Sequence, residues 1–135
     1  MRLAKIFETV KSFTTKYKVV LPLHPRTRNA IARDKLSLGN IVTIDPLGYD
    51  DMQRLLSISK LALTDSGGLQ KEAYFHGVPC VTLRDETEWV ELIEHGWNRL
   101  WTETQYKERK PISEYGEGQT GIIIMNLIRE HLSKR

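Results

Sequence analysis

The sequence predicts an α/β fold in which a parallel sheet is covered by helices on both faces. Short runs rich in Val, Ile and Leu alternate with segments whose apolar residues recur at three- and four-residue spacing. The first pattern is typical of strands buried on both faces, and the second is typical of amphipathic helices. The chain of 135 residues, with 40% hydrophobic and 27% charged residues, is long enough for one domain with its own core.

The first half of the chain is predicted to contain three helices and two strands. Residues 2–15 form the first helix because their apolar side chains share one face: Leu3, Ile6, Phe7, Val10 and Phe13. The run KVVLPL (18–23) is a buried strand, and a turn and a helix follow from Pro25 to about Lys35. A second strand, NIVTI (40–44), ends at the break DPLG (45–48), and residues 50–59 carry Met52, Leu55 and Leu56 on one helical face.

The second half continues the alternation. Residues 61–64 are the third strand, and a helix over 69–76 ends at Gly77, a natural helix C-cap. The fourth strand is PCVTL (79–83), a helix over 88–94 ends at Gly96, and residues 98–101 form a fifth strand. Residues 102–120 are polar and irregular, so we expect a loop. The last helix, 121–132, is marked by Ile124, Leu127, Ile128 and Leu132.

The segment LALTDSGGLQKE (61–72) is the most informative part of the chain. A Ser-Gly-Gly turn between a strand and a helix leaves backbone N–H groups unpaired at the positive end of the helix dipole, where a phosphate binds well. Ligands of parallel sheets also bind at the carboxyl ends of strands. Ser66, Gly67 and Gly68 are therefore predicted to hold a phosphate or diphosphate. Glu72, about one helical turn further, is placed to accept the hydroxyls of an attached ribose. A purely structural turn, capped by Asp65 or Ser66, is the alternative.

Other residue types narrow the function. A net charge of +3 suits an anionic ligand but is too small to indicate nucleic acid. The single cysteine, Cys80, lies in an apolar run and is predicted to be a buried, inert thiol. The four histidines lack metal-ligand spacing, so we expect no metal. The Gly-Gly turn matches neither the G-x-G-x-x-G nor the P-loop pattern, which disfavours a dinucleotide dehydrogenase and an ATPase, and we expect no cofactor. His76 and His95 precede glycines at helix ends, where capping is expected, whereas His24 ends a strand on the ligand side.

Polar residues also gather directly after the fourth strand. Arg84 and Asp85 lie there as candidate substrate or regulatory contacts, followed by three more carboxylates: Glu86, Glu88 and Glu91. An N-terminal helix charge is an equally good interpretation of Glu86 and Glu91. No apolar run approaches the length of a membrane span, and no signal peptide is present, so we expect a cytoplasmic protein that binds no membrane.

Four motifs resemble the non-hydrolysing UDP-N-acetylglucosamine 2-epimerases, and YGEGQ (115–119) is similar to a fifth segment of that family. The four are DSGGLQKEA (65–73), GVP (77–79), LRDETE (83–88) and GWNRL (96–100), and the resemblance covers residues 17–101 continuously. It implies a Rossmann-like, three-layer parallel sheet that is one half of a two-domain glycosyltransferase-B-type fold (UDP-glycosyltransferase/glycogen phosphorylase-like). Residues 1–135 would be the single UDP-binding domain, the C-terminal half of such an epimerase.

The resemblance assigns roles to residues. It places Ser66, Gly67 and Gly68 on the diphosphate and Glu72 on the ribose. The loop from Leu47 to Met52, including Tyr49, would lie against the uracil. His24 matches a histidine associated with an additional nucleotide-sugar contact, although it stands here in HPRT. The implied reaction interconverts UDP-GlcNAc and UDP-ManNAc by elimination and re-addition of UDP, in cell-surface polysaccharide biosynthesis, with a homodimer at full length.

The same resemblance limits this chain. The family's N-terminal domain supplies the catalytic carboxylates, so we expect no catalytic residue among residues 1–135, weak UDP binding and no epimerase activity of the chain alone. The chain begins in a helix, whereas such folds usually begin with a strand, so a first strand is expected to be missing; an edge helix over a smaller sheet is the alternative. Residues 102–113 are shorter than the family's usual segment. A non-catalytic UDP-sugar-binding module, a glycosyltransferase of the same architecture and a decayed gene product are the other functional interpretations.

Overall fold

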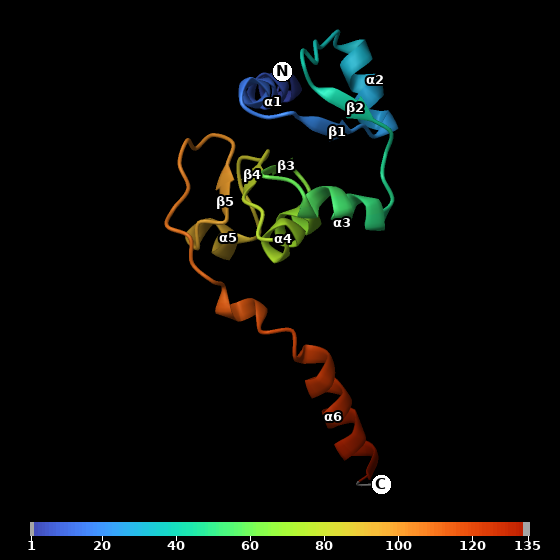
Figure 1. The fold of residues 1–135 in the computed structure, drawn as a ribbon, viewed down its shortest axis with the longest axis vertical. Helices are drawn as coiled ribbons and strands as arrows, with labels where there is room; N and C mark the ends of the chain where they lie inside the picture. Colours follow the sequence, from blue (N-terminus) through green and yellow to red (C-terminus); the bar gives the residue numbers. More distant parts are fainter. Residues whose placement is uncertain (1, 134–135) are drawn as a thin grey trace.

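The computed structural model describes residues 2–133, in which helices and strands alternate along the chain (Figure 1). All the predicted strands and helices are present. The strands are β1 (Val20–Pro22), β2 (Val42–Ile44), β3 (Ala62–Thr64), β4 (Cys80–Thr82) and β5 (Asn98–Leu100). The α-helices are α1 (Arg2–Ser12), α2 (Pro25–Arg33), α3 (Tyr49–Ser57), α4 (Gly67–Phe75), α5 (Val90–Glu94) and α6 (Thr120–Ser133), and two 3-10 turns are η1 (Phe13–Thr15) and η2 (Ser113–Tyr115).

The strands form two parallel sheets rather than the single sheet that the alternation predicts. β1 pairs with β2, whereas β3, β4 and β5 form a second sheet in that order. Among residues 2–133, β1 and β3 are each paired along one edge only. Residues of both edges line a groove instead of sharing a ladder. The two sheets lie apart in Figure 1.

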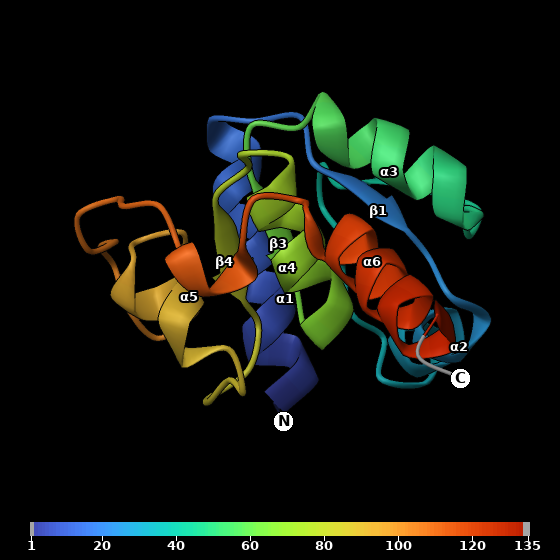
Figure 2. The same cartoon turned by 90° about the horizontal axis from the view of Figure 1, so that it is seen from below.

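Each sheet has its own apolar core. One cluster joins α3 and α4 to β3 and β4 through Leu56, Ala62, Ala73, Val78 and Cys80. The other joins Phe7 and Val10 of α1 to Val19 and Ile41, which directly precede β1 and β2, and partly buried side chains such as Leu3 and Leu83 pack against it. Because Leu83 follows β4, this second cluster reaches across the groove and holds the two sheets together. α1 overlaps β3, β4 and α4 in Figure 2, but Figure 1 shows α4 on the far side of β3 and β4 from α1.

Two helices begin elsewhere than predicted. α4 begins at Gly67 rather than residue 69, because Ser66 is its N-cap and accepts the Leu69 N–H on its hydroxyl (3.4 Å). α5 begins at Val90 rather than residue 88, because the Thr87 hydroxyl accepts the Trp89 N–H at 3.1 Å and holds the preceding residues in a loop. The helix-dipole interpretation is therefore wrong for Glu86, which precedes α5, whereas Glu91 is in the first turn of α5.

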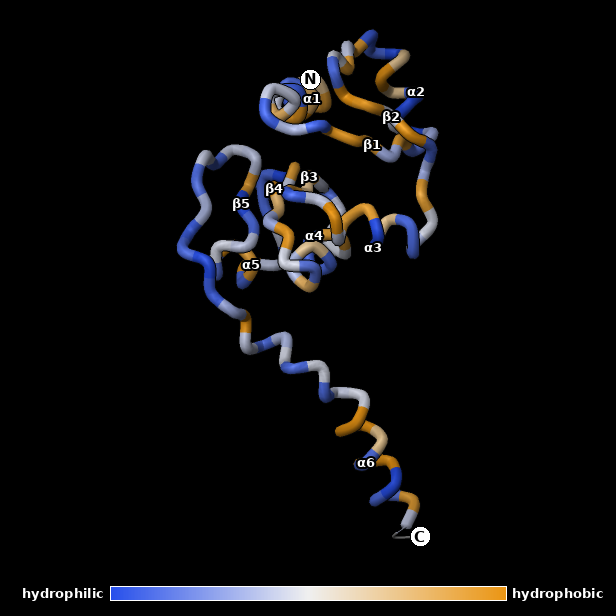
Figure 3. Tube along the Cα trace, viewed as in Figure 1, coloured by the Kyte–Doolittle hydropathy of each residue, from blue (hydrophilic) through white to orange (hydrophobic). Residues whose placement is uncertain are grey.

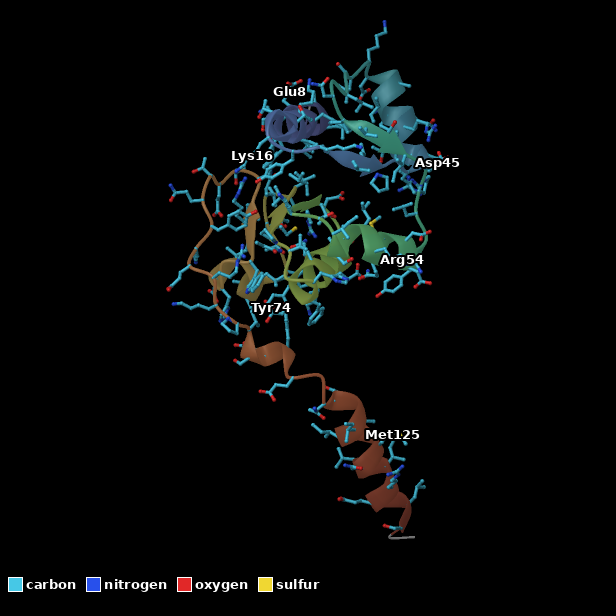
Figure 4. All side chains as sticks on the ribbon, in the orientation of Figure 1. Glu8, Lys16, Asp45, Arg54, Tyr74 and Met125 are labelled. Carbon is cyan, nitrogen blue, oxygen red and sulfur yellow. The ribbon has the colours of Figure 1, made fainter. Side chains whose placement is uncertain are left out.

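The predicted loop after β5 packs against the second sheet. Gly96 has a φ of +71°, and a Cβ there would lie 2.3 Å from the Lys107 carbonyl oxygen, so only glycine lets this loop approach. The Trp97 indole N–H donates to the Lys110 carbonyl oxygen at 2.7 Å. Tyr74, labelled in Figure 4, accepts the Ile112 N–H on its hydroxyl at 3.1 Å where the chain turns away from the sheets.

Helix α6 extends away from the rest of the molecule. Its apolar side chains are exposed, among them Ile122 (60%), Leu127 (60%) and Met125 (50%), which is labelled in Figure 4. The hydropathy colouring of Figure 3 shows hydrophobic stretches along α6, which lies apart from the two sheets. No helix among residues 2–133 has the length and apolar character needed to span a membrane.

Candidate functional site

The Ser-Gly-Gly turn forms the N-terminus of α4, at the carboxyl end of β3. Thr64, the last residue of β3, accepts the Ser66 N–H on its hydroxyl at 3.0 Å and so fixes the cap. In the part of the chain that the structure describes, the N–H groups of Gly67 and Gly68 have no hydrogen-bond acceptor. These two donors at the positive end of α4 form a site for an anion, as the sequence predicts.

The two glycines differ in what surrounds them. A Cβ on Gly67 would lie 2.3 Å from Oε1 of Glu88 and 3.2 Å from Nε1 of Trp89, so the half-exposed end of Glu88 would have to move to admit a side chain. A Cβ on Gly68 would meet nothing nearer than the Ser66 hydroxyl oxygen, 3.9 Å away. A side chain at Gly67 would thus disturb the contacts that Glu88 and Trp89 make here. Gly68 faces open space, where its lack of a side chain leaves room for a ligand.

Gln70, which the sequence did not single out, holds the Ser-Gly-Gly turn in place from within the protein interior. Its side chain is fully buried, and its Nε2 donates to the Ser66 carbonyl oxygen at 3.4 Å. Its Oε1 accepts from the Thr82 hydroxyl (3.1 Å), the Thr87 hydroxyl (2.8 Å) and the Asn98 amide (3.3 Å). One glutamine therefore ties the α4 N-terminus to β4, to β5 and to the loop before α5.

Glu72 lies one helical turn beyond the glycines and is held in place by α3. Its Oε2 accepts the Gln53 amide N–H at 2.8 Å, and the Gln53 Oε1 lies 2.8 Å from Nε2 of His76. Since an amide oxygen only accepts, the His76 Nε2 carries the proton in this contact. His76 is also the C-cap of α4, as predicted. Gln53 comes from a different helix, and no pattern in the sequence connects it to Glu72.

The predicted site residues lie partly together. A groove of about 1050 Å³, which we call the inter-sheet groove, runs between β1 and β3, and its wall includes His24, Met52, Ser66, Gly68 and Glu72. Leu47, Tyr49, Gly67, Arg84 and Asp85 are not in that wall. Tyr49 is 69% exposed at the start of α3. The phosphate candidates Ser66 and Gly68 and the ribose candidate Glu72 thus line the same groove as Met52, one residue of the expected uracil loop.

The loop from Leu83 to Trp89 packs against the Ser-Gly-Gly turn at Gly67, which is not in the groove wall. Trp89 donates its indole N–H to the Gly67 carbonyl oxygen at 2.9 Å, and the Lys71 ammonium stands 3.5 Å above its ring centroid. Arg84 forms an ion pair with Glu88 at 2.9 Å, and Asp85 accepts the Trp101 indole N–H at 2.9 Å. Arg84 and Asp85 therefore both have partners within the chain.

His24 is the N-cap of α2, where its Nδ1 accepts the Arg26 N–H at 3.2 Å. The other ring nitrogen, Nε2, therefore faces the groove or solvent. Cys80 is fully buried, which confirms the predicted burial, and burial raises the pKa of its thiol to about 12. Among residues 2–133 no group of three or more metal-ligating side chains occurs.

Comparisons with known proteins agree on one family. The family model described as UDP-N-acetylglucosamine 2-epimerase matches residues 1–128. The UDP-2,3-diacetamido-2,3-dideoxy-D-glucuronate 2-epimerase of Pseudomonas aeruginosa is 54% identical over 101 residues, which cover 74% of this chain and 28% of that relative.

Solved structures give the same result. The UDP-GlcNAc 2-epimerase of Methanocaldococcus jannaschii matches 96% of this chain with a TM-score of 0.81 and 34% identity. A crystal structure of that enzyme with UDP-GlcNAc and UDP matches with a TM-score of 0.72 and 31% identity, again over 96% of this chain. These matches confirm the predicted α/β, glycosyltransferase-B-type architecture. The chain spans 28% to 41% of the length of these relatives. It belongs to the UDP-N-acetylglucosamine 2-epimerase family.

Proposed function

We propose that this chain binds the UDP moiety of a UDP-sugar at the N-terminus of α4. The observation that carries the proposal is the pair of unpaired N–H groups at Gly67 and Gly68, one turn from a carboxylate, Glu72, that Gln53 holds in place. The glycine N–H groups would bind the diphosphate, with Ser66 shaping the turn, and Glu72 would accept the ribose hydroxyls. A relative of known structure binds UDP-GlcNAc and UDP, which supports this ligand.

The chemical role of such a site is to hold a leaving group. In a 2-epimerisation that proceeds by elimination and re-addition, negative charge develops on the diphosphate as the bond to the sugar breaks. Preorganised N–H donors at a helix N-terminus stabilise that charge without reorganising. We propose that this chain contributes this part of a UDP-sugar 2-epimerase. The UDP-sugar would be UDP-GlcNAc or, by similarity to the Pseudomonas aeruginosa relative, UDP-2,3-diacetamido-2,3-dideoxy-D-glucuronate.

The remaining predicted contacts belong to the same proposal. Leu47, Tyr49 and Met52 would contact the uracil, and Met52 supports this because it lines the groove beside Glu72. His24 would make an additional contact with the nucleotide-sugar across the same groove. Arg84 and Asp85 would reach a ligand only by exchanging their present partners. The homodimer and the cytoplasmic location remain predictions.

Titration calorimetry with UDP tests the proposal on the whole chain. We expect saturable binding that Glu72→Ala weakens about tenfold or more, since hydrogen bonds to a charged group contribute about 1.5–3 kcal/mol each. Glu94→Ala is the matched control, because Glu94 is an exposed carboxylate on α5 outside the groove wall, and its affinity should equal that of the wild type. Absence of UDP binding, or equal affinity of the Glu72 variant, would refute the proposal.

A further inference from the structure

A second pocket lies at the opposite end of β3 from the candidate nucleotide site. Its wall includes Leu61 and Pro79, which directly precede β3 and β4, so it opens at the amino ends of these strands. Its volume is about 370 Å³. One side comes from the segment that follows α1, where Figure 4 labels Lys16, and the other side comes from the loop after β5, which contributes Tyr106.

The charged side chains of this pocket, which we call the basic pocket, are all cationic. Lys16, Lys60, Arg99 and Arg109 lie in its wall, and no carboxylate of residues 2–133 does. Within the same described residues, none of these four cations forms an ion pair. A concave wall that carries one sign of charge concentrates the electrostatic potential. A bound anion would relieve the repulsion among the four cations.

Arg99 is held in place by backbone carbonyls and an aromatic ring. Its Nη1 donates to the carbonyl oxygen of Leu100 at 3.2 Å and to that of Glu103. Its guanidinium carbon lies 5.4 Å from the ring centroid of Tyr106, whose hydroxyl donates to the Cys80 carbonyl oxygen at 3.1 Å. In the part of the chain that the structure describes, Nε and Nη2 of Arg99 donate to no acceptor. These two nitrogens form the edge of a guanidinium that binds two oxygens of a phosphate.

Arg109 is also held by an aromatic ring, although it stands in the mixed run KERK (107–110). The carboxylate of that run, Glu108, pairs with Lys110 at 3.0 Å. The Arg109 guanidinium lies instead 4.7 Å from the ring centroid of Trp97, whose indole N–H holds the loop through the Lys110 carbonyl oxygen at 2.7 Å. Stacking on a ring fixes a guanidinium and leaves its N–H groups available to a ligand.

We propose that the basic pocket binds a compact anion with two or more negative charges, namely a diphosphate group. Arg99 would bind two oxygens through Nε and Nη2, and Arg109 would bind a third. Lys16 and Lys60 would neutralise the remaining charge from the rim. The volume is near the lower end of the roughly 300–1,000 Å³ of small-molecule sites, which suits a small ligand. The chain would thus bind phosphate groups at both ends of β3.

A titration followed by nuclear magnetic resonance tests the proposal. The probe is sodium pyrophosphate, added to the isotope-labelled whole chain while sodium chloride keeps the ionic strength constant. Backbone amide spectra report each residue separately, so they distinguish the basic pocket from the N-terminus of α4. We expect saturable shifts at Leu61, Arg99 and Tyr106, with one binding curve that is separate from any curve at Gly67 and Gly68. UDP is absent, so the outcome is independent of the proposed nucleotide site.

Charge-removing variants locate the ligand. Arg99→Gln should weaken pyrophosphate binding in the basic pocket about tenfold or more, because the paired N–H groups to a charged oxygen are lost. Lys5→Gln is the matched control: it removes one exposed positive charge from α1, outside the pocket wall, and should bind like the wild type. If Arg99→Gln does not fold, the double variant of the exposed side chains, Lys16→Gln with Lys60→Gln, decides, with binding weakened about threefold or more.

The possible results are distinct. Shifts confined to Gly67 and Gly68, or equal affinity of Arg99→Gln and Lys5→Gln for pyrophosphate, would overturn the proposal. So would equal shifts at Leu61 and Tyr106 when sodium chloride alone is added. A second titration with UDP identifies the source of the diphosphate: shifts at Arg99 and Tyr106 would show that the pocket accepts an ester, whereas shifts there with pyrophosphate only would show that it binds the free anion.

Discussion

Replacing Gly68 by alanine tests whether the Ser-Gly-Gly turn binds a ligand or is only structural. The new Cβ would lie 3.9 Å from the nearest side-chain atom, so it fits without displacing anything within the chain. Gly68 also has a helical backbone with negative φ, which alanine adopts readily. The methyl group would, however, add to the groove wall at the N-terminus of α4, where the diphosphate is proposed to bind.

The two effects have opposite signs. Alanine in a helix is favoured over glycine by about 0.5–1 kcal/mol, so the free energy of unfolding should rise slightly. Loss of one hydrogen bond to a charged oxygen costs about 1.5–3 kcal/mol, so UDP affinity should fall roughly 10- to 100-fold. Urea unfolding monitored by circular dichroism measures the first effect, and calorimetry with UDP measures the second.

Gly67→Ala is the comparison. Its Cβ would displace the Glu88 carboxylate and crowd the Trp89 indole, so this variant should be less stable than Gly68→Ala, in addition to any loss of affinity. The reasoning is refuted if Gly68→Ala binds UDP as tightly as the wild type. That result would leave the Gly-Gly pair as a turn shaped only by packing.

Three further outcomes follow from the structure. Gln70→Leu should lower the free energy of unfolding by about 3 kcal/mol, because the Thr82 hydroxyl and the Asn98 amide lose their buried acceptor; urea denaturation beside the exposed Gln119→Leu control measures this. Burial raises the pKa of Cys80 from 9.0 and of Tyr106 from 10.0, each to about 12. The folded chain therefore keeps protons that the unfolded chain releases, and stability should fall between pH 9 and pH 12, less steeply in Cys80→Ala. The 135-residue chain alone should show no turnover of UDP-GlcNAc, and product formation detected by chromatography would contradict the assignment of the catalytic carboxylates to another domain.

The order of strands and helices could be predicted from the sequence because each depends on local patterns. Apolar runs such as 79–83 and helical spacing such as that of Leu55 and Leu56 describe single elements. The division into two sheets could not be predicted. Whether β1 lies beside β3 depends on how segments far apart in the chain pack, and local patterns carry no information on that. The start of α4 was misplaced for a smaller reason: glycines are poor helix formers, yet the Ser66 cap and the buried Gln70 hold them in the first turn.

The candidate site likewise contains residues that the sequence predicted and residues that only the structure revealed. Ser66, Gly67, Gly68 and Glu72 lie within one strand–turn–helix segment, so their spacing alone predicted their proximity. Gln53 contacts Glu72 from 19 residues away in the chain, and Trp89 contacts Gly67 from 22 residues away. Such contacts depend on how helices and loops pack, for which a single sequence carries no periodic signal. The residues that orient the site were therefore found only in the structure.

The position of Trp89 gives the molecule an optical reporter. All three tryptophans lie between residues 89 and 101, and none belongs to the β1–β2 half. Trp89 bonds to the carbonyl of Gly67 and lies beneath the Lys71 ammonium, so its emission depends on the electric field at the tip of α4. An incoming diphosphate would change that field directly. Nucleotide binding should thus be visible in the intrinsic fluorescence of the unlabelled chain, without any introduced chromophore.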